Sequence, residues 1–302
     1  MIRKALFLIT LILLTACSPA SFQGATPKPG LPRVLAVETF LADITQNIAG
    51  DRLTVESLLP ENSDPHSYQP APRDIIKVSR SDVLIINGVG IEGFLEPLLV
   101  NAGGERLIIT ASQGLIPRPD PSGEHPEGDP HFWLDPNNVI QYTKNIRDGL
   151  IEADPQGSTI YTSNATAYIS RLEELDAWIK EQVNKIPADQ RQLVTNHDSL
   201  GYFASRYGFT IVGSIIPSVS SEADPTARQL VNLIDQIRKS KAKAIFMETG
   251  SNLNLADQIS GETKTRIVTD LYIHSVSNAS GPAQTYIEMM KYNVTQIVNA
   301  LK

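Results

Sequence analysis

The sequence predicts an α/β protein of two lobes, each a mainly parallel sheet flanked by helices, joined by one long rigid helix. Short apolar runs alternate with amphipathic stretches in both halves of the chain, which is typical of parallel strands connected by helices. About 270 residues follow the N-terminal segments, which is more than one hydrophobic core usually contains. Between the halves lies a stretch without internal proline whose apolar residues mostly recur at helical spacings.

The first residues have the pattern of an export signal. Arg3 and Lys4 precede an apolar run that is too short to span a membrane as a helix, and small residues follow it. The only cysteine of the chain comes directly after Leu-Thr-Ala, which resembles the bacterial lipobox. We therefore predict a lipoprotein signal peptide at 1–16, a lipid on Cys17 that anchors the mature chain to a membrane, and a flexible tether over 17–32.

The composition limits the partners of the mature chain. Residues 1–16 hold two of the 26 basic residues and none of the 33 acidic ones, so the formal net charge falls from −7 to −9 once they are removed. An acidic surface disfavours nucleic acid and suits cations. A mature chain with one cysteine cannot form an internal disulfide, so its stability must come from its core.

The first lobe is expected over 33–153. A loop rich in proline and glycine is expected at 114–130, and Asp135-Pro136 is typical of a helix start that leads to about Ala153. The other expected elements follow from apolar runs and helical spacings. They are strands at 34–37, 53–60, 82–88 and 106–110, and helices at 40–49, 71–80 and 91–101.

The connecting helix is expected over 154–186, and the second lobe over 187–302. A continuous helix of roughly thirty residues would be about 45 Å long, enough to run along both lobes. In the second lobe the alternation of strands and helices resumes. The expected strands are 192–195, 209–216, 243–248 and 266–269, and the expected helices are 199–207, 226–240, 252–260 and 283–301.

Three histidines and one aspartate stand at predicted strand ends or helix starts. His66 and His131 each end an Asp-Pro-His sequence. His197 and Asp270 follow predicted strands of the second lobe. Ligands of open α/β sheets bind at the carboxyl ends of the strands, so we expect these residues to face one crevice. Imidazoles with one carboxylate suit a borderline divalent cation such as Zn²⁺. An aspartate beside a histidine, Asp64, Asp129 or Asp198, could orient an imidazole.

The other two histidines have weaker cases. His125 lies in the loop rich in proline and glycine and is interpreted as a solvated residue, and His274 has no evident ligand partner. Motifs of other chemistries, such as H-E-x-x-H, G-x-S-x-G and the Walker loop, do not occur in the sequence. A zinc hydrolase with an open coordination position, and an adhesin with a purely structural metal, remain as alternative functions.

Several segments carry a resemblance to one family. They are LLTAC at 13–17, LLPENSDPHSYQPAPRD at 58–74, DVLIINGVGIEGFLEPLL at 82–99, DPHFWLDPNNV at 129–139, TNHDSLGYFASRYG at 195–208 and TDLY at 269–272. In these segments the chain resembles the metal-specific solute-binding lipoproteins of bacterial ABC importers, the ZnuA-like and TroA-like receptors. The resemblance implies two lobes joined by one long helix, with a metal held by His66 and His131 from the first lobe and His197 and Asp270 from the second.

The resemblance also implies a function. We expect an exported receptor, not an enzyme, that is lipid-anchored to the outer face of the cytoplasmic membrane or periplasmic, and that delivers Zn²⁺ as a monomer to an ABC permease. Receptors resembling manganese carriers place Glu where this chain has His197, so three histidines favour zinc, with Mn²⁺ or iron as the alternative. Glu222 and Glu248 are reserve ligands should Asp270 lie too far away.

Overall fold

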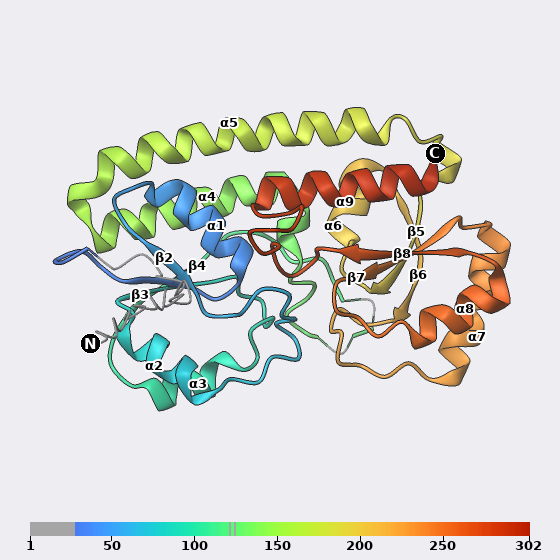
Figure 1. Ribbon diagram of the computed structural model, residues 1–302, viewed down its shortest axis with the longest axis horizontal. Helices are drawn as coiled ribbons and strands as arrows, with labels where there is room; N and C mark the ends of the chain where they lie inside the picture. Colours follow the sequence, from blue (N-terminus) through green and yellow to red (C-terminus); the bar gives the residue numbers. More distant parts are fainter. Residues whose placement is uncertain (1–27, 121, 124) are drawn as a thin grey trace, which may run out of the picture.

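The structure is a computed structural model that describes residues 28–120, 122–123 and 125–302. The predicted signal peptide, Cys17 and most of the predicted tether lie outside the described residues. Two α/β lobes lie side by side, and one long helix runs along both of them (Figure 1). The predicted fold class is confirmed. Among the described residues, no helix combines the length and the apolar character that crossing a membrane requires.

The first lobe is built on a parallel sheet with the strand order β2-β1-β3-β4. Side chains alternate between the two faces of a strand. Val34 and Ala36 accordingly belong to the apolar cluster that includes residues of α1, α4 and α5, whereas Leu35 belongs to the cluster of α2 and α3. The elements are β1 (Val34–Ala36), α1 (Thr39–Ala49), β2 (Val55–Ser57), α2 (Pro72–Arg80), β3 (Val83–Ile86), α3 (Leu95–Ala102), β4 (Leu107–Thr110), η1 (Phe132–Leu134) and α4 (Pro136–Ala153).

The second lobe repeats this architecture with the strand order β6-β5-β7-β8. One face packs on α7 and α8 through a separate cluster that contains Val194 and Ile245, and the other face packs on α6 and α9. The elements are η3 (Ala188–Gln190), β5 (Gln192–His197), α6 (Gly201–Tyr207), β6 (Thr210–Ile216), α7 (Ala227–Ser240), β7 (Ala244–Glu248), α8 (Asn254–Thr263), β8 (Arg266–Leu271) and α9 (Tyr286–Leu301).

The helix α5 (Ser158–Val183) connects the lobes and spans them along one side (Figure 1). Its 26 residues correspond to a length of about 39 Å. It packs on α1 and α4 of the first lobe and on α9, so its buried side is covered along both lobes. The helix starts later than the sequence predicts, because Pro155–Gly157 forms a 3-10 turn, η2, between α4 and α5.

Candidate metal centre

Four histidines from the two lobes converge between the sheets. His66 lies in the loop after β2, His131 directly precedes η1, His197 ends β5 and His274 lies in the loop after β8. One ring nitrogen of each lies within 4.8 Å of the corresponding nitrogens of the other three. Nε2 of His131 is 3.3 Å from that of His66 and 3.2 Å from those of His197 and His274. We call this group the four-histidine cluster.

The separations of His131 Nε2 from the other three nitrogens are those of ligands that share one metal ion. With zinc–nitrogen bonds of 2.0–2.1 Å, two ligand atoms at the corners of a tetrahedron are about 3.3–3.4 Å apart. The observed separations of 3.2–3.3 Å from His131 lie close to that value. Without a cation between them, unprotonated nitrogens at this distance would present lone pairs to one another, which is repulsive. The cluster therefore fits a single divalent metal ion.

The two Asp-Pro-His sequences build the same local turn. In each, Oδ1 of the aspartate accepts a hydrogen bond of 3.0 Å from the backbone N–H of the histidine two residues later, Asp64 to His66 and Asp129 to His131. This hydrogen bond forms an Asx-turn, and the intervening proline fixes the backbone angle φ within it. Each histidine therefore reaches the cluster from a constrained loop.

Two buried carboxylates contact the outer nitrogens of three of the imidazoles. Oδ1 of Asp129 lies 2.8 Å from Nδ1 of His131. The oxygens of Glu248, at the end of β7, lie 2.5 Å from Nδ1 of His197 and 3.1 Å from Nδ1 of His274. The hydrogen bond to Asp129 places the proton of His131 on Nδ1 and leaves its Nε2 free to bind a metal, while Glu248 sets a negative charge against the Nδ1 atoms of His197 and His274.

Burial and charge set the protonation of the cluster. His131 and His197 are fully buried. Burial, and then the neighbouring histidines, lower the pKa of His66 and His131 well below the usual range, so both imidazoles are neutral as metal binding requires. Burial also lowers the pKa of His197, but the charge of Glu248 outweighs it and raises that pKa. Burial raises the pKa of Asp129 to about 7, while His197 and His274 outweigh burial at Glu248 and lower its pKa.

The structure places Asp270 away from the cluster, contrary to the sequence prediction. Its side chain is exposed, and its Oδ2 accepts a hydrogen bond of 2.8 Å from the hydroxyl of Thr269. The predicted strand ended at residue 269, but β8 continues to Leu271, so the chain reaches the crevice only at the residues that follow. His274 occupies the fourth position, with 6% of its surface exposed.

The remaining candidates have different positions. Glu248 was named as a reserve ligand, and the structure places it behind the cluster, against the Nδ1 atoms. Glu222 is exposed. His125 is half-buried with Nε2 3.5 Å from the hydroxyl of Ser218, and it is not a member of the cluster. A signal for His274 was available in the sequence, because it too follows a predicted strand of the second lobe within a few residues.

A polar hollow of about 160 Å³ leads to the cluster from solvent. Its lining includes Asp64, Glu248 and His274 together with several hydroxyl groups. At its edge the lobes contact one another, since the N–H of Asn62 donates to the hydroxyl of Ser275 over 2.9 Å and the hydroxyl of Ser221 donates to Asp64. The hollow therefore reaches one of the four imidazoles, that of His274.

Two α/β lobes that bring buried histidines together in the crevice between them define a receptor for a metal ion. The chain belongs to the family described as "Zinc-uptake complex component A periplasmic", whose model matches residues 34–300. The family consists of substrate-binding receptors, so the chain is a receptor and not an enzyme, and it is exported and either membrane-anchored or periplasmic. The predicted family, receptor role and location are confirmed.

Relatives with different metals in their names are similar to this chain over nearly its whole length. The manganese-binding lipoprotein MntA of Halalkalibacterium halodurans is 34% identical over 297 residues, which cover 98% of this chain and 97% of the relative. The iron-binding protein YfeA of Yersinia pestis is 34% identical over 299 residues, 97% of this chain and 95% of that protein. The periplasmic zinc binding protein TroA from Treponema pallidum superposes with a TM-score of 0.81 at 28% identity, over 90% of this chain and 99% of that one.

Proposed function

We propose that this protein is a zinc receptor that binds Zn²⁺ with the four-histidine cluster and delivers it to an ABC permease. The observation that carries the proposal is the donor set, four imidazole nitrogens with no carboxylate oxygen among them. Imidazole suits Zn²⁺ and other borderline ions, whereas Mn²⁺ prefers carboxylate, carbonyl and water oxygens. The distances of 3.2–3.3 Å from Nε2 of His131 to the other three Nε2 atoms are close to those between ligands of a tetrahedral zinc ion and support the same metal.

Manganese or iron is the second candidate, because the relatives named above include a manganese-binding lipoprotein and an iron-binding protein. The position of Glu248 weighs against Mn²⁺. Its two oxygens contact the outer nitrogens of His197 and His274 and do not lie among the four Nε2 atoms. To bind Mn²⁺ in the same crevice, the protein would have to use four imidazoles in place of the carboxylate, carbonyl and water oxygens that this ion prefers.

The cluster also argues against a zinc hydrolase. A hydrolytic zinc site keeps one coordination position for a water molecule, and three protein ligands hold the metal. Here four imidazole nitrogens lie within 4.8 Å of one another, enough protein ligands to fill a tetrahedral site without water. A closed site of this kind suits capture and transfer of the ion.

Anchoring and partners complete the proposal. We infer that Cys17 carries a lipid, that the lobes extend over 33–153 and 187–302 with the connector between them, and that the receptor acts as a monomer. The formal net charge of −9 after removal of residues 1–16, two basic and no acidic residues, suits a cation and not a nucleic acid. The permease partner is inferred from the family to which the chain belongs.

Metal analysis of the purified mature protein, followed by competitive titration of the metal-free form with Zn²⁺ and Mn²⁺, tests the proposal. We expect one equivalent of zinc and an affinity for Zn²⁺ far above that for Mn²⁺. Comparable or tighter binding of Mn²⁺ would keep the receptor role and overturn the assignment of zinc. Absence of stoichiometric metal would overturn the site itself.

A further inference from the structure

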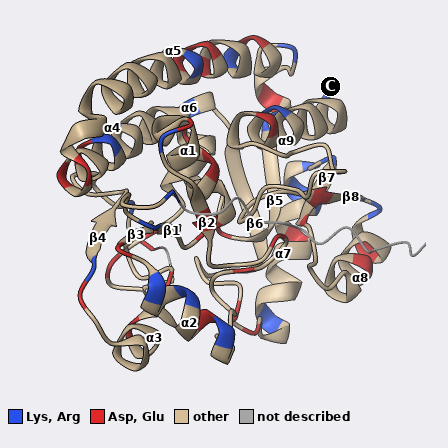
Figure 2. Ribbon diagram, turned by 60° about the vertical axis from the view of Figure 1, so that its left-hand side comes forward, with Lys and Arg blue, Asp and Glu red and all other residues tan. Residues whose placement is uncertain are grey.

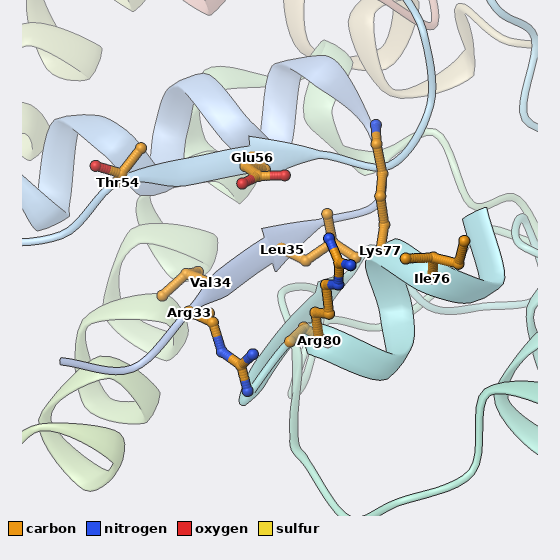
Figure 3. A pocket seen from close by; sticks show the side chains of 9 residues that line it. Arg33, Val34, Leu35, Thr54, Glu56, Ile76, Lys77 and Arg80 are labelled. Carbon is orange, nitrogen blue, oxygen red and sulfur yellow. The ribbon is translucent and has the colours of Figure 1, made fainter. Parts of the chain in front are cut away.

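A second hollow lies in the first lobe, between the sheet and α2, and contains none of the metal-site residues (Figure 3). Its volume is about 240 Å³. The strands β1 and β2 form one wall and the last turns of α2 form the other. The lining residues are Arg33, Val34, Leu35, Thr54, Glu56, Ile76, Lys77, Arg80 and Ser81. We call it the α2 hollow.

The α2 hollow is basic within an acidic protein. Arg33, Lys77 and Arg80 line it with a single carboxylate, that of Glu56. Two of the cations have partners: Arg33 makes a two-pronged ion pair with Asp82 at 2.8 and 2.9 Å, and Lys77 donates to the carbonyl of Ser57 over 3.0 Å. Figure 2 shows the basic residues along α2.

Arg80 differs from the other two cations. Among the described residues it has no hydrogen-bond or ion-pair partner, and its side chain extends from α2 toward the strands (Figure 3). The apolar side chains that line the hollow on the α2 side of the sheet are those of Leu35 and Ile76, of which Ile76 is 49% exposed. The unpaired guanidinium of Arg80 beside apolar side chains suits an amphiphilic ligand, one with an anionic group and a hydrocarbon chain.

The position of the α2 hollow along the chain points to the membrane as the source of that ligand. The described chain starts at Lys28, whose ammonium contacts the carbonyl of Asp51 shortly before β2, and Arg33 follows five residues later. If Cys17 carries the lipid, the eleven residues from there to Lys28 can span at most about 40 Å. Lys28 therefore stays within about 40 Å of the membrane surface whenever the anchor is inserted, and the first lining residue, Arg33, follows five residues later.

We propose that the α2 hollow binds the head group of an anionic phospholipid, with Arg80 and Lys77 at the phosphate and the apolar wall against the start of the acyl chains. Each basic residue near an anionic surface favours binding, and the lipid anchor keeps the local concentration of head groups high. An acidic chain that is tethered at its N-terminus and binds head groups in the α2 hollow would be held with the first lobe on the membrane. The proposal does not depend on which metal the receptor carries.

Vesicle sedimentation tests the proposal. The probe is the mature chain from residue 17 with Cys17→Ser, so that no lipid anchor dominates, mixed with vesicles of phosphatidylglycerol or of phosphatidylcholine. We expect binding to phosphatidylglycerol alone and displacement by a short-chain phosphatidylglycerol below its micelle concentration. Arg80→Glu should weaken binding roughly tenfold or more.

Lys239→Glu is the matched control. Arg80 and Lys239 are both exposed, and each lies in the last turn of an amphipathic helix, α2 and α7 respectively. The two reversals change the net charge and the helix end equally. An equal loss of binding in both variants would reduce the effect to net charge and overturn the site. Displacement by inorganic phosphate as effective as that by the short-chain lipid would make it a free-anion site and overturn the lipid assignment. Unchanged zinc affinity in Arg80→Glu verifies that the variant is folded.

Discussion

An oxygen of Glu248 lies 2.5 Å from Nδ1 of His197, and its other oxygen lies 3.1 Å from Nδ1 of His274. One buried carboxylate from β7 therefore fixes the orientation of two imidazoles that come from different segments of the second lobe. It also places a negative charge behind the cluster, which favours a cation in front of it.

Replacing Glu248 by glutamine should weaken zinc binding by about 10- to 100-fold, because the amide keeps the size of the side chain but removes the charge and one acceptor. Isothermal titration with a competing chelator measures the affinity, and circular dichroism reports on folding. The exposed Glu222→Gln is the control and should bind zinc as the unmodified protein does. An unchanged affinity in Glu248→Gln would show that the imidazoles keep their orientation without this carboxylate.

His274 and Asp270 provide a direct comparison of two candidate ligands in one segment. His274 belongs to the cluster and Asp270 is exposed. We expect His274→Ala to lower zinc affinity more than about 100-fold and Asp270→Ala to leave it unchanged. Loss of affinity in Asp270→Ala with no loss in His274→Ala would restore the ligand set that the sequence predicts.

The same position should control the choice of metal. His274→Asp replaces an imidazole with a carboxylate and so moves the donor set toward harder ions. We expect the ratio of zinc to manganese affinity to fall by about tenfold or more in this variant. Competitive titration with both metals measures the ratio, and His274→Asn, which carries no charge, separates the effect of the carboxylate from the loss of the imidazole. A ratio unaffected in His274→Asp would mean that residue 274 does not select the metal.

The sequence predicted the order of strands and helices because most strands lie in apolar runs, such as β3 and β7, and most helices have an apolar stripe. The structure brings together His66, His131 and His197, which the sequence predicted as ligands because loops at strand ends and two Asp-Pro-His turns are local features. The choice between Asp270 and His274 was not local. It depended on where β8 ends. The strand is two residues longer than predicted, so Asp270 lies within it and the loop that reaches the crevice begins after Leu271. The role of Glu248 could be recognised only from the three-dimensional positions of the His197 and His274 rings.

Asp176 on α5 should make the stability of the protein sensitive to acid. Burial opposes its charge, but Arg206, Lys180 and the hydroxyl of Tyr207 outweigh it and lower the pKa of Asp176 to about 2. The unfolded value is near 3.9, so the stabilising contribution is complete above about pH 4 and is lost as the pH falls toward 2.

Asp176→Asn should lower the free energy of unfolding by about 2 kcal/mol at pH 7, since hydrogen bonds to a charged group are lost. The difference from the unmodified protein should shrink as the pH falls from 4 to 2. Urea unfolding of the metal-free protein at several pH values measures both quantities. The exposed Asp189→Asn serves as the control. A difference that stays constant down to pH 2 would contradict the lowered pKa.

Trp133 connects the first lobe to the loop that carries His274. Its indole N–H donates to the carbonyl of Ile273 over 2.8 Å, and its ring stacks on Phe40 with centroids 4.5 Å apart. Trp133→Phe keeps an aromatic ring in this fully buried place but leaves the carbonyl next to His274 without its donor. We expect the free energy of unfolding to fall by about 1–3 kcal/mol from the unpaired carbonyl and the smaller ring.

Zinc should also dissociate faster from Trp133→Phe, because the loop that holds His274 is then free to shift relative to His131. Stopped-flow transfer of zinc to a chelator measures the dissociation rate. Tyr168→Phe is the control, since the Tyr168 hydroxyl is buried and has no hydrogen-bond partner among the described residues. A Trp133→Phe protein that loses stability but releases zinc at the unmodified rate would show that the position of His274 is fixed within the second lobe alone.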